Sequence, residues 1–414
     1  MAELYDIKDV EEKVILVAVA TSDNDDTEES LEELKELAKT AGATVVAKVI
    51  QNREAVHPGT YVGKGKIEEI KELATTLEAT GVICDDELSP AQLKNLEDAL
   101  DIKVMDRTLV ILDIFAARAL TSEGKIQVEL AQLKYRSSRL VGLRSSLSRL
   151  GGGIGTRGPG EKKIEIDRRL IKDRIAQLNR ELSEVKRHRE LARAQRSKNP
   201  NAIVAIVGYT NAGKSTLLNT LTDANILAED KLFATLDPTT RNLALPSGEN
   251  VLLTDTVGFI RKLPHHLIDA FRSTLEEAKY ADIIVHVVDA SNEQMDTQMH
   301  IVYQTLEELG VEDKPIITLF NKMDKLEFVP VLRDFKADKT LFVSAKNGKG
   351  MEELLSEIES ILRSRKIYVE KCYPYSEASK IQVIRKYGQL LSEEYTENGI
   401  EVKAYVPCEI YGNV

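Results

Sequence analysis

The sequence predicts a multidomain α/β protein. An N-terminal α/β domain plus a helical arm precedes a parallel-sheet domain, and a small C-terminal α+β domain follows. Apolar strand-like runs alternate with helical leucine spacings in two stretches, and two long helical stretches flank a glycine-rich segment. The predicted domains are 1–110, 111–199 with the glycine-rich loop 151–161, 200–367 and 368–414.

Composition favours a folded protein of the cytoplasm. Hydrophobic residues make up 43% of the 414 positions and charged residues 30%, so several buried cores are possible. No apolar stretch is long enough to predict a membrane span, and the acidic N-terminus lacks a signal pattern. Cys84, Cys372 and Cys408 lie far apart, which argues against a disulfide framework or a zinc site and fits a reducing compartment.

The N-terminal domain shows strand–helix alternation. Ser89 is expected to cap a helix whose first turn contains Pro90. The predicted strands are 14–20, 43–50 and 81–84, and the predicted helices are 30–39, 66–77 and 89–100.

The arm consists of two helical stretches, 109–150 and 164–195, joined by Gly151–Glu161 with its six glycines. Residues 131–200 contain 19 Lys and Arg against 7 Asp and Glu, a local charge of +12 in a chain of net charge −11. This basic island fits a polyanionic partner, and it also fits a solvated helix with many surface cations. Charge alone leaves both interpretations open.

A second α/β pattern starts after the boundary segment 197–201. A tail with β-α-β character ends in 401–406. The predicted strands are 202–207, 251–254, 283–288, 316–320 and 341–344, and the predicted helices are 214–221, 267–278 and 350–363.

Gly208–Ser215 fits the P-loop pattern G-x-x-x-x-G-K-[ST] between a strand and a helix. Its backbone N–H groups and the helix N-terminus can surround phosphates, Lys214 can reach the β- and γ-phosphates, and the Ser215 hydroxyl can bind Mg²⁺. The predicted contacts from this segment are Gly208, Tyr209, Thr210, Asn211, Ala212, Gly213, Lys214, Ser215 and Thr216.

Three later motifs, each after a strand, complete the site, and two of them select guanine over adenine. In Asp255-Thr256-Val257-Gly258, the aspartate can organise Mg²⁺ and the glycine N–H can meet the γ-phosphate. In Asn321-Lys322-Met323-Asp324, the carboxylate can accept both N1–H and the exocyclic amine of guanine, a donor pair that adenine lacks. The backbone of Ser344-Ala345-Lys346 can meet the guanine carbonyl, so the sequence predicts binding of GTP and GDP.

These motifs, in this order, resemble the translation-factor-related class of P-loop GTPases, and within it the HflX family. The resemblance covers most of the chain. His57–Lys66 is similar to that family's N-terminal signature, Gly151–Glu161 to its glycine-rich loop, and Phe233–Arg241 to its switch I segment. It implies an enzyme that hydrolyses GTP to GDP and phosphate.

The resemblance points to Thr239 as the switch I residue that completes Mg²⁺ coordination with Ser215 and Asp255, although sequence leaves Thr240 open. Phe233 and Thr235 of the same segment are implied nucleotide contacts. The residues expected to act in hydrolysis are Lys214, Thr239, Gly258 and Asn211.

Phe259 stands where many GTPases place a glutamine that orients the attacking water. Phenylalanine cannot hydrogen-bond water, so hydrolysis should be slow unless another group acts. One hypothesis is that Asn211 helps hold a K⁺ ion that stabilises the transition state; the alternative is that Asn211 only shapes the loop.

The implied partner is the ribosome, especially its 50S subunit and rRNA, with splitting or rescue of stalled or idle ribosomes as the function. The arm, with Arg157 at its tip, would contact rRNA, or it could fold back and regulate the GTPase domain. A role in ribosome assembly or with an RNA-modifying partner stays open, as does a nucleotide-gated protein scaffold. We expect a monomer.

Overall fold

The structure is a computed structural model. It describes residues 12–21, 26–147, 159–196, 201–222, 232–233, 239–264, 277–328, 331–407 and 410–413. The chain divides into two compact units. The first is Met1–Val185, Asp230–Leu236 and Arg261–Arg272, and the second is Lys186–Glu229, Asp237–Ile260 and Ser273–Val414.

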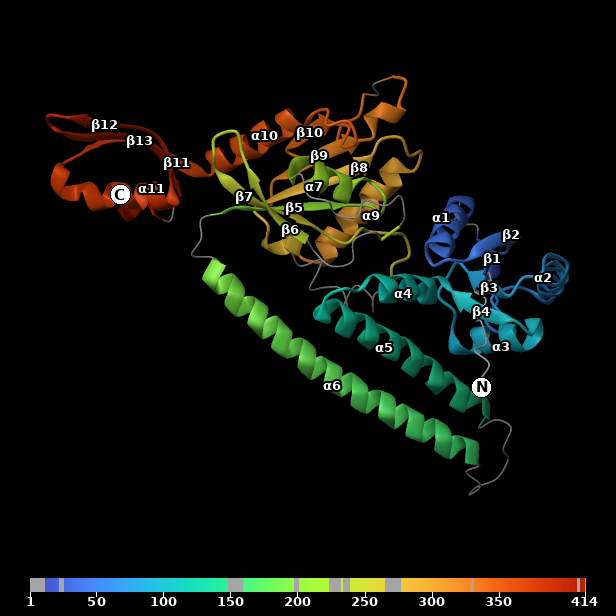
Figure 1. The fold of residues 1–414 in the computed structure, drawn as a ribbon. Helices are drawn as coiled ribbons and strands as arrows, with labels where there is room; N and C mark the ends of the chain where they lie inside the picture. The colour runs from blue at the N-terminus through green and yellow to red at the C-terminus, as the bar shows by residue number, and fades with distance from the viewer. Residues whose placement is uncertain are drawn as a thin grey trace, which may run out of the picture. The chain divides into compact units, whose positions relative to one another are not determined.

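A four-stranded parallel sheet forms the centre of the first unit (Figure 1). Its strands are β1 (Lys13–Ala20), β2 (Thr44–Asn52), β3 (Gly81–Cys84) and β4 (Lys103–Asp106), in the order β2-β1-β3-β4. Continuous apolar runs such as that of β1 are buried along nearly their whole length, as expected for a parallel sheet with both faces covered. The short strand β4 was absent from the sequence prediction.

Helices connect these strands, because parallel neighbours need a crossover. The predicted cap of α3 is confirmed: Ser89 Oγ accepts from the Gln92 N–H, the Gln92 side chain accepts from the Ser89 N–H, and Pro90 is the first helical residue. The helices are α1 (Thr27–Thr40), α2 (Lys64–Leu77), α3 (Pro90–Leu100) and α4 (Arg107–Arg118).

The predicted continuous helix 109–150 is wrong, because it is interrupted between residues 118 and 122. The chain leaves the helix at Ala119, and α5 (Ser122–Leu147) starts where the Thr121 hydroxyl accepts from the Gly124 N–H. Apolar spacing continues across this break, so periodicity alone did not reveal it.

Helix α5 packs against α6 (Pro159–Arg196), as a helical hairpin predicts. Buried Leu130, Leu178 and Leu182 form the contact, and Arg174 makes two hydrogen bonds to Glu129 at 2.8 and 3.0 Å. Arg157 and most of the glycine-rich loop lie outside the described residues.

The second unit contains a six-stranded sheet in the order β10-β9-β8-β5-β7-β6 (Figure 1). All neighbouring strands are parallel except β6, which runs antiparallel to β7. The strands are β5 (Ile203–Gly208), β6 (Thr239–Ala244), β7 (Asn250–Asp255), β8 (Ile283–Asp289), β9 (Ile316–Asn321) and β10 (Lys339–Phe342).

Helices α7 (Lys214–Thr222), α9 (Met295–Glu308) and α10 (Met351–Ser364) accompany this sheet. Leu217 and Leu218 of α7 and Leu354 and Ile358 of α10 are buried in the same core as the strands. Neither β6 nor α9 was predicted, and the predicted helix 267–278 falls mostly outside the described residues.

A small antiparallel sheet follows α10. Helix α11 places Ile381 and Ile384 in a core with Val402 and Ala404 of the central strand. The elements are β11 (Lys366–Tyr373), α11 (Ala378–Tyr387), β12 (Gln389–Thr396) and β13 (Gly399–Pro407), in the sheet order β11-β13-β12, one strand more than the predicted β-α-β tail.

The predicted fold class is therefore confirmed: an N-terminal α/β domain with helices, a parallel-sheet domain around a P-loop, and a small C-terminal α+β domain. The bounds of the four predicted domains stay a prediction. Within the described residues, no helix combines the length and apolar character that a bilayer crossing needs.

Candidate nucleotide-binding site

The P-loop packs against Asn321, the first residue of the predicted guanine-binding motif Asn321–Asp324 (the base motif). Gly213 has φ +102°, and a Cβ atom there would lie 2.3 Å from Asn321 Nδ2. Only glycine combines this backbone with such a close neighbour. The Asn321 amide donates to the Ala212 carbonyl at 2.8 Å, so the loop after β5 and the end of β9 form one rigid piece.

Lys214 begins α7 and is buried. Its Nζ donates to the carbonyl oxygens of Gly208 and Tyr209 at 3.1 and 2.7 Å. The pKa of Lys214 is lowered to about 8, chiefly because the side chain is buried; the Asp255 carboxylate opposes this shift and the charge of Lys322 adds to it. A desolvated ammonium on weak carbonyl acceptors is suited to exchange them for phosphate oxygens.

Oxygen donors of the predicted metal site lie together. Ser215 Oγ donates to Asp255 Oδ2 at 2.9 Å, and Thr239 is the direct cross-strand neighbour of Asp255 in the β6–β7 ladder. Directly paired residues point to the same face of a sheet. Hydroxyl and carboxylate oxygens are ligands that Mg²⁺ accepts, so this donor set fits that ion.

Thr240 is directed elsewhere. It is paired with Thr254, and the two hydroxyl oxygens lie 3.0 Å apart. Because adjacent strand residues face opposite sides, this geometry favours Thr239 as the metal ligand.

The segment Gly258–Ile260, called switch II here, is joined to the P-loop by backbone hydrogen bonds. Thr210 N–H donates to the Phe259 carbonyl at 2.8 Å, and Phe259 N–H donates to the Gly208 carbonyl at 3.2 Å. A Cβ atom on Gly258 would lie 2.8 Å from Thr210 Cγ2 and 3.0 Å from Lys214 Nζ. The Phe259 side chain is buried, so it presents no group to a water molecule. Sequence reasoning missed this bridge, since it consists of backbone atoms.

Hydrogen bonds join the two predicted guanine-binding motifs, Asn321–Asp324 and Ser344–Lys346. Ser344 Oγ donates to Asp324 Oδ1 at 2.6 Å, and Ala345 N–H donates to Asn321 Oδ1 at 2.9 Å. The Ser344 hydrogen bond is the main cause that lowers the pKa of Asp324, which keeps its exposed carboxylate ionised as an acceptor.

Two further residues support these motifs. Thr220 Oγ1 donates to the Ala345 carbonyl at 2.8 Å, and Asp289 forms an ion pair with Lys322 at 2.8 Å. The position of Asp289 at the carboxyl end of a parallel strand is a signal that could have identified it.

Three further predicted site residues are Asn211, Phe233 and Thr235. The Asn211 side chain is exposed on the loop at φ +60°. Phe233 belongs to the first unit, where its ring packs edge-on against Phe115 with centroids 4.7 Å apart. Thr235 lies outside the described residues.

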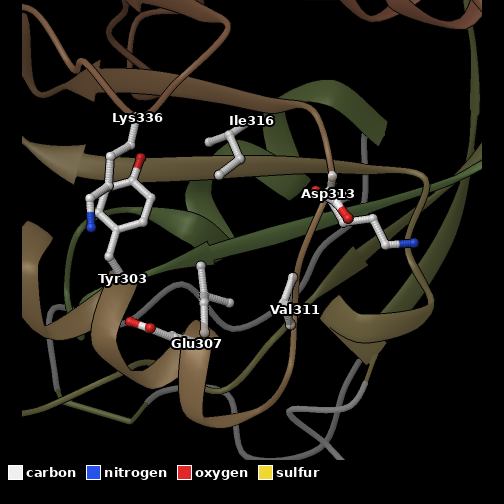
Figure 2. A pocket seen from close by; sticks show the side chains of 8 residues that line it. Tyr303, Glu307, Val311, Asp313, Ile316 and Lys336 are labelled. Carbon is white, nitrogen blue, oxygen red and sulfur yellow. The ribbon is translucent and has the colours of Figure 1, made fainter.

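A hollow of about 170 Å³ lies in the second unit, between α9 and the start of β9 (Figure 2). Figure 2 shows Tyr303, Glu307, Ile316 and Lys336 around it. It contains none of the predicted site residues.

Three protein families match successive parts of the chain. A family described as GTP-binding GTPase N-terminal matches residues 28–116, and GTP-binding GTPase Middle Region matches 118–196. A family described as 50S ribosome-binding GTPase matches residues 203–322.

Several curated relatives carry the name GTPase HflX. The protein of Lacrimispora saccharolytica is 69% identical over 100% of this chain and 98% of its own. That of Caldanaerobacter subterraneus subsp. tengcongensis is 52% identical, covering 96% and 92%, and that of Escherichia coli K12 is 42% identical, covering 86% and 84%. Among solved structures, a GTP-binding protein from Sulfolobus solfataricus in complex with GDP is 25% identical, with a TM-score of 0.45 over 84% of this chain and 98% of that chain.

Proposed function

Because the chain belongs to the HflX family of GTPases, and is a GTPase itself, we propose that it acts on the ribosome. It binds the 50S subunit and its rRNA as a cytoplasmic monomer. GTP binding and hydrolysis control this association, and the result is splitting or rescue of stalled or idle ribosomes. The observation that carries the proposal is the match of residues 203–322, which contain the P-loop and DxxG, to the 50S ribosome-binding GTPase family.

The charge of the arm supports an RNA partner. Residues 131–200 carry a local charge of +12, and Lys172, Arg180 and Arg187 of α6 are exposed. Neutralisation of RNA phosphates by such side chains releases counterions, which favours association at low salt.

In the proposed reaction, water attacks the γ-phosphate of GTP in line with the bond to the β-phosphate. Lys214 leaves the carbonyls of Gly208 and Tyr209 and binds phosphate oxygens. Ser215, Thr239 and Asp255 would hold Mg²⁺, which would supply positive charge against the phosphate oxygens. The base lies against Asn321 and Asp324.

The attacking water needs a partner other than Phe259, whose side chain is buried. Exposed Asn211 stands on the P-loop and is the proposed ligand of a K⁺ ion that stabilises the transition state.

Sedimentation with purified bacterial ribosomes tests the partner. With a non-hydrolysable GTP analogue, the full chain should co-migrate with 50S subunits or whole ribosomes, and Lys214→Ala should lose the increase that the analogue causes. A chain that hydrolyses GTP but never co-migrates would refute the ribosome proposal.

A further inference from the structure

Asp289 ends strand β8, which is apolar apart from Asp289 and His286, directly beside the base motif. It pairs in register with Asn321 of β9, and the Asp289 Oδ2 lies 2.8 Å from Lys322 Nζ. The Asp289 and Lys322 side chains are only 14% and 17% exposed. A carboxylate that has lost this much hydration needs ion-pair and hydrogen-bond partners to compensate its charge, so those partners indicate its role.

The orientation of the Asp289 carboxylate is fixed on its other side. Asp289 Oδ1 accepts hydrogen bonds from the Ser291 N–H at 3.0 Å and from Ser291 Oγ at 2.6 Å. The Ala290 N–H donates to the Asn321 carbonyl at 3.0 Å, which ties this turn to the strand that carries the base motif. The carboxylate is therefore a fixed point, and Lys322 is the long side chain that it holds.

Lys322 has an uncommon backbone for its residue type. Its φ is +63°, in the left-handed region that L-residues with a Cβ adopt only at an energetic cost. Lys322 also lies near the P-loop, because its neighbour Asn321 donates to the Ala212 carbonyl at 2.8 Å. The ion pair with Asp289 holds Lys322 in this conformation, and it therefore sets the direction of the Lys322 side chain between Asn321 and Asp324.

We propose that Asp289 is a positioning residue for guanine. Its ion pair holds Lys322 so that the methylene stem of Lys322 covers one face of the base, while Asp324 binds the edge. The inference rests on the proposed placement of the base at Asn321–Asp324. A contact with the ring face does not sense the exocyclic amine of guanine, whereas Asp324 does.

Affinities for fluorescent mant-GDP and for its inosine analogue mant-IDP, which lacks the amine, test this role. Asp289→Asn should weaken both by the same factor, roughly tenfold, through faster dissociation. Asp324→Asn should weaken mant-GDP more than mant-IDP. If Asp324→Asn leaves this preference unchanged, the placement of the base is wrong; if only Asp289→Asn is without effect, the positioning role alone is wrong.

A double-mutant cycle separates positioning from stability. In a Lys322→Met background, Asp289→Asn should change nucleotide affinity less than twofold, because the lysine through which Asp289 acts is absent. If the two substitutions instead weaken affinity independently, so that their factors multiply in the double variant, the proposal is overturned. The matched control is Glu249→Gln, which breaks the similarly shielded pair of Glu249 and Lys366, 18% and 13% exposed. This control should lower the unfolding temperature about as much as Asp289→Asn and leave nucleotide affinity unchanged.

Discussion

Lys214 makes nucleotide affinity depend on pH. In the ligand-free chain, burial lowers its pKa to about 8, whereas bound phosphates should raise it because they stabilise the ammonium. Nucleotide binding above pH 8 must therefore be accompanied by uptake of a proton. The affinity for GDP should fall as pH rises through 8.

The size of this effect follows from the pKa. With a value of about 8 in the free chain, Lys214 is mostly protonated at pH 7 and about one-tenth protonated at pH 9, so the affinity should weaken about tenfold between these values. The stability of the ligand-free chain should change with pH in the opposite direction. Above pH 8 the unfolded chain binds the proton that the folded chain releases, so the free energy of unfolding should rise from pH 8 towards 10.5.

Titration of mant-GDP binding at pH 7, 8 and 9 measures the slope. Lys214→Arg is the control, because guanidinium stays charged and any titration of the nucleotide is shared by both proteins. The wild-type chain should show the tenfold loss in addition to the change of the arginine variant. Parallel pH profiles of the two proteins would refute the assigned role of Lys214.

Three further predictions concern the same site. Gly258→Ala would place a methyl group 2.8 Å from Thr210 Cγ2, so GTP hydrolysis should fall about 100-fold while GDP affinity changes little, measured by phosphate release and mant-GDP binding; unchanged hydrolysis would contradict the close packing. Thr220→Val removes the donor to the Ala345 carbonyl and should weaken GDP about fivefold, whereas Thr222→Val, which removes a hydroxyl that donates to the Leu218 carbonyl, should not. GTP turnover should be faster in KCl than in NaCl, and Asn211→Ala should abolish the difference; equal rates in the two salts for the wild-type chain would exclude K⁺ assistance.

The sequence could predict the P-loop and the base motifs because their chemistry is local. Gly213, Lys214 and Ser215 are consecutive, and the strand before them and the helix after them were readable from apolar spacing. The sequence could not choose between Thr239 and Thr240. That choice depends on the register that pairs Thr239 with Asp255, and the antiparallel strand β6 was itself not predicted.

Asp289 shows the same limit at longer range. Lys322 is distant in sequence, and the two side chains meet only because β8 and β9 are parallel and pair Asp289 with Asn321. An aspartate at a strand end has no motif of its own, whereas the asparagine of the base motif does. The residues proposed to recognise the base could therefore be named from sequence, whereas the residues that support them required the sheet.

The bridge between the P-loop and switch II suggests how the γ-phosphate could be sensed. A methyl group on Gly258 would already be 3.0 Å from Lys214 Nζ, so a phosphate group that contacts both residues requires them to move apart. GDP, which lacks this group, makes no such demand. Lys214 can supply this displacement when it leaves the carbonyls of Gly208 and Tyr209. If Gly258 moves as well, the hydrogen bonds that join Phe259 to Gly208 and Thr210 must lengthen, so a γ-phosphate acts on this bridge whereas a diphosphate does not.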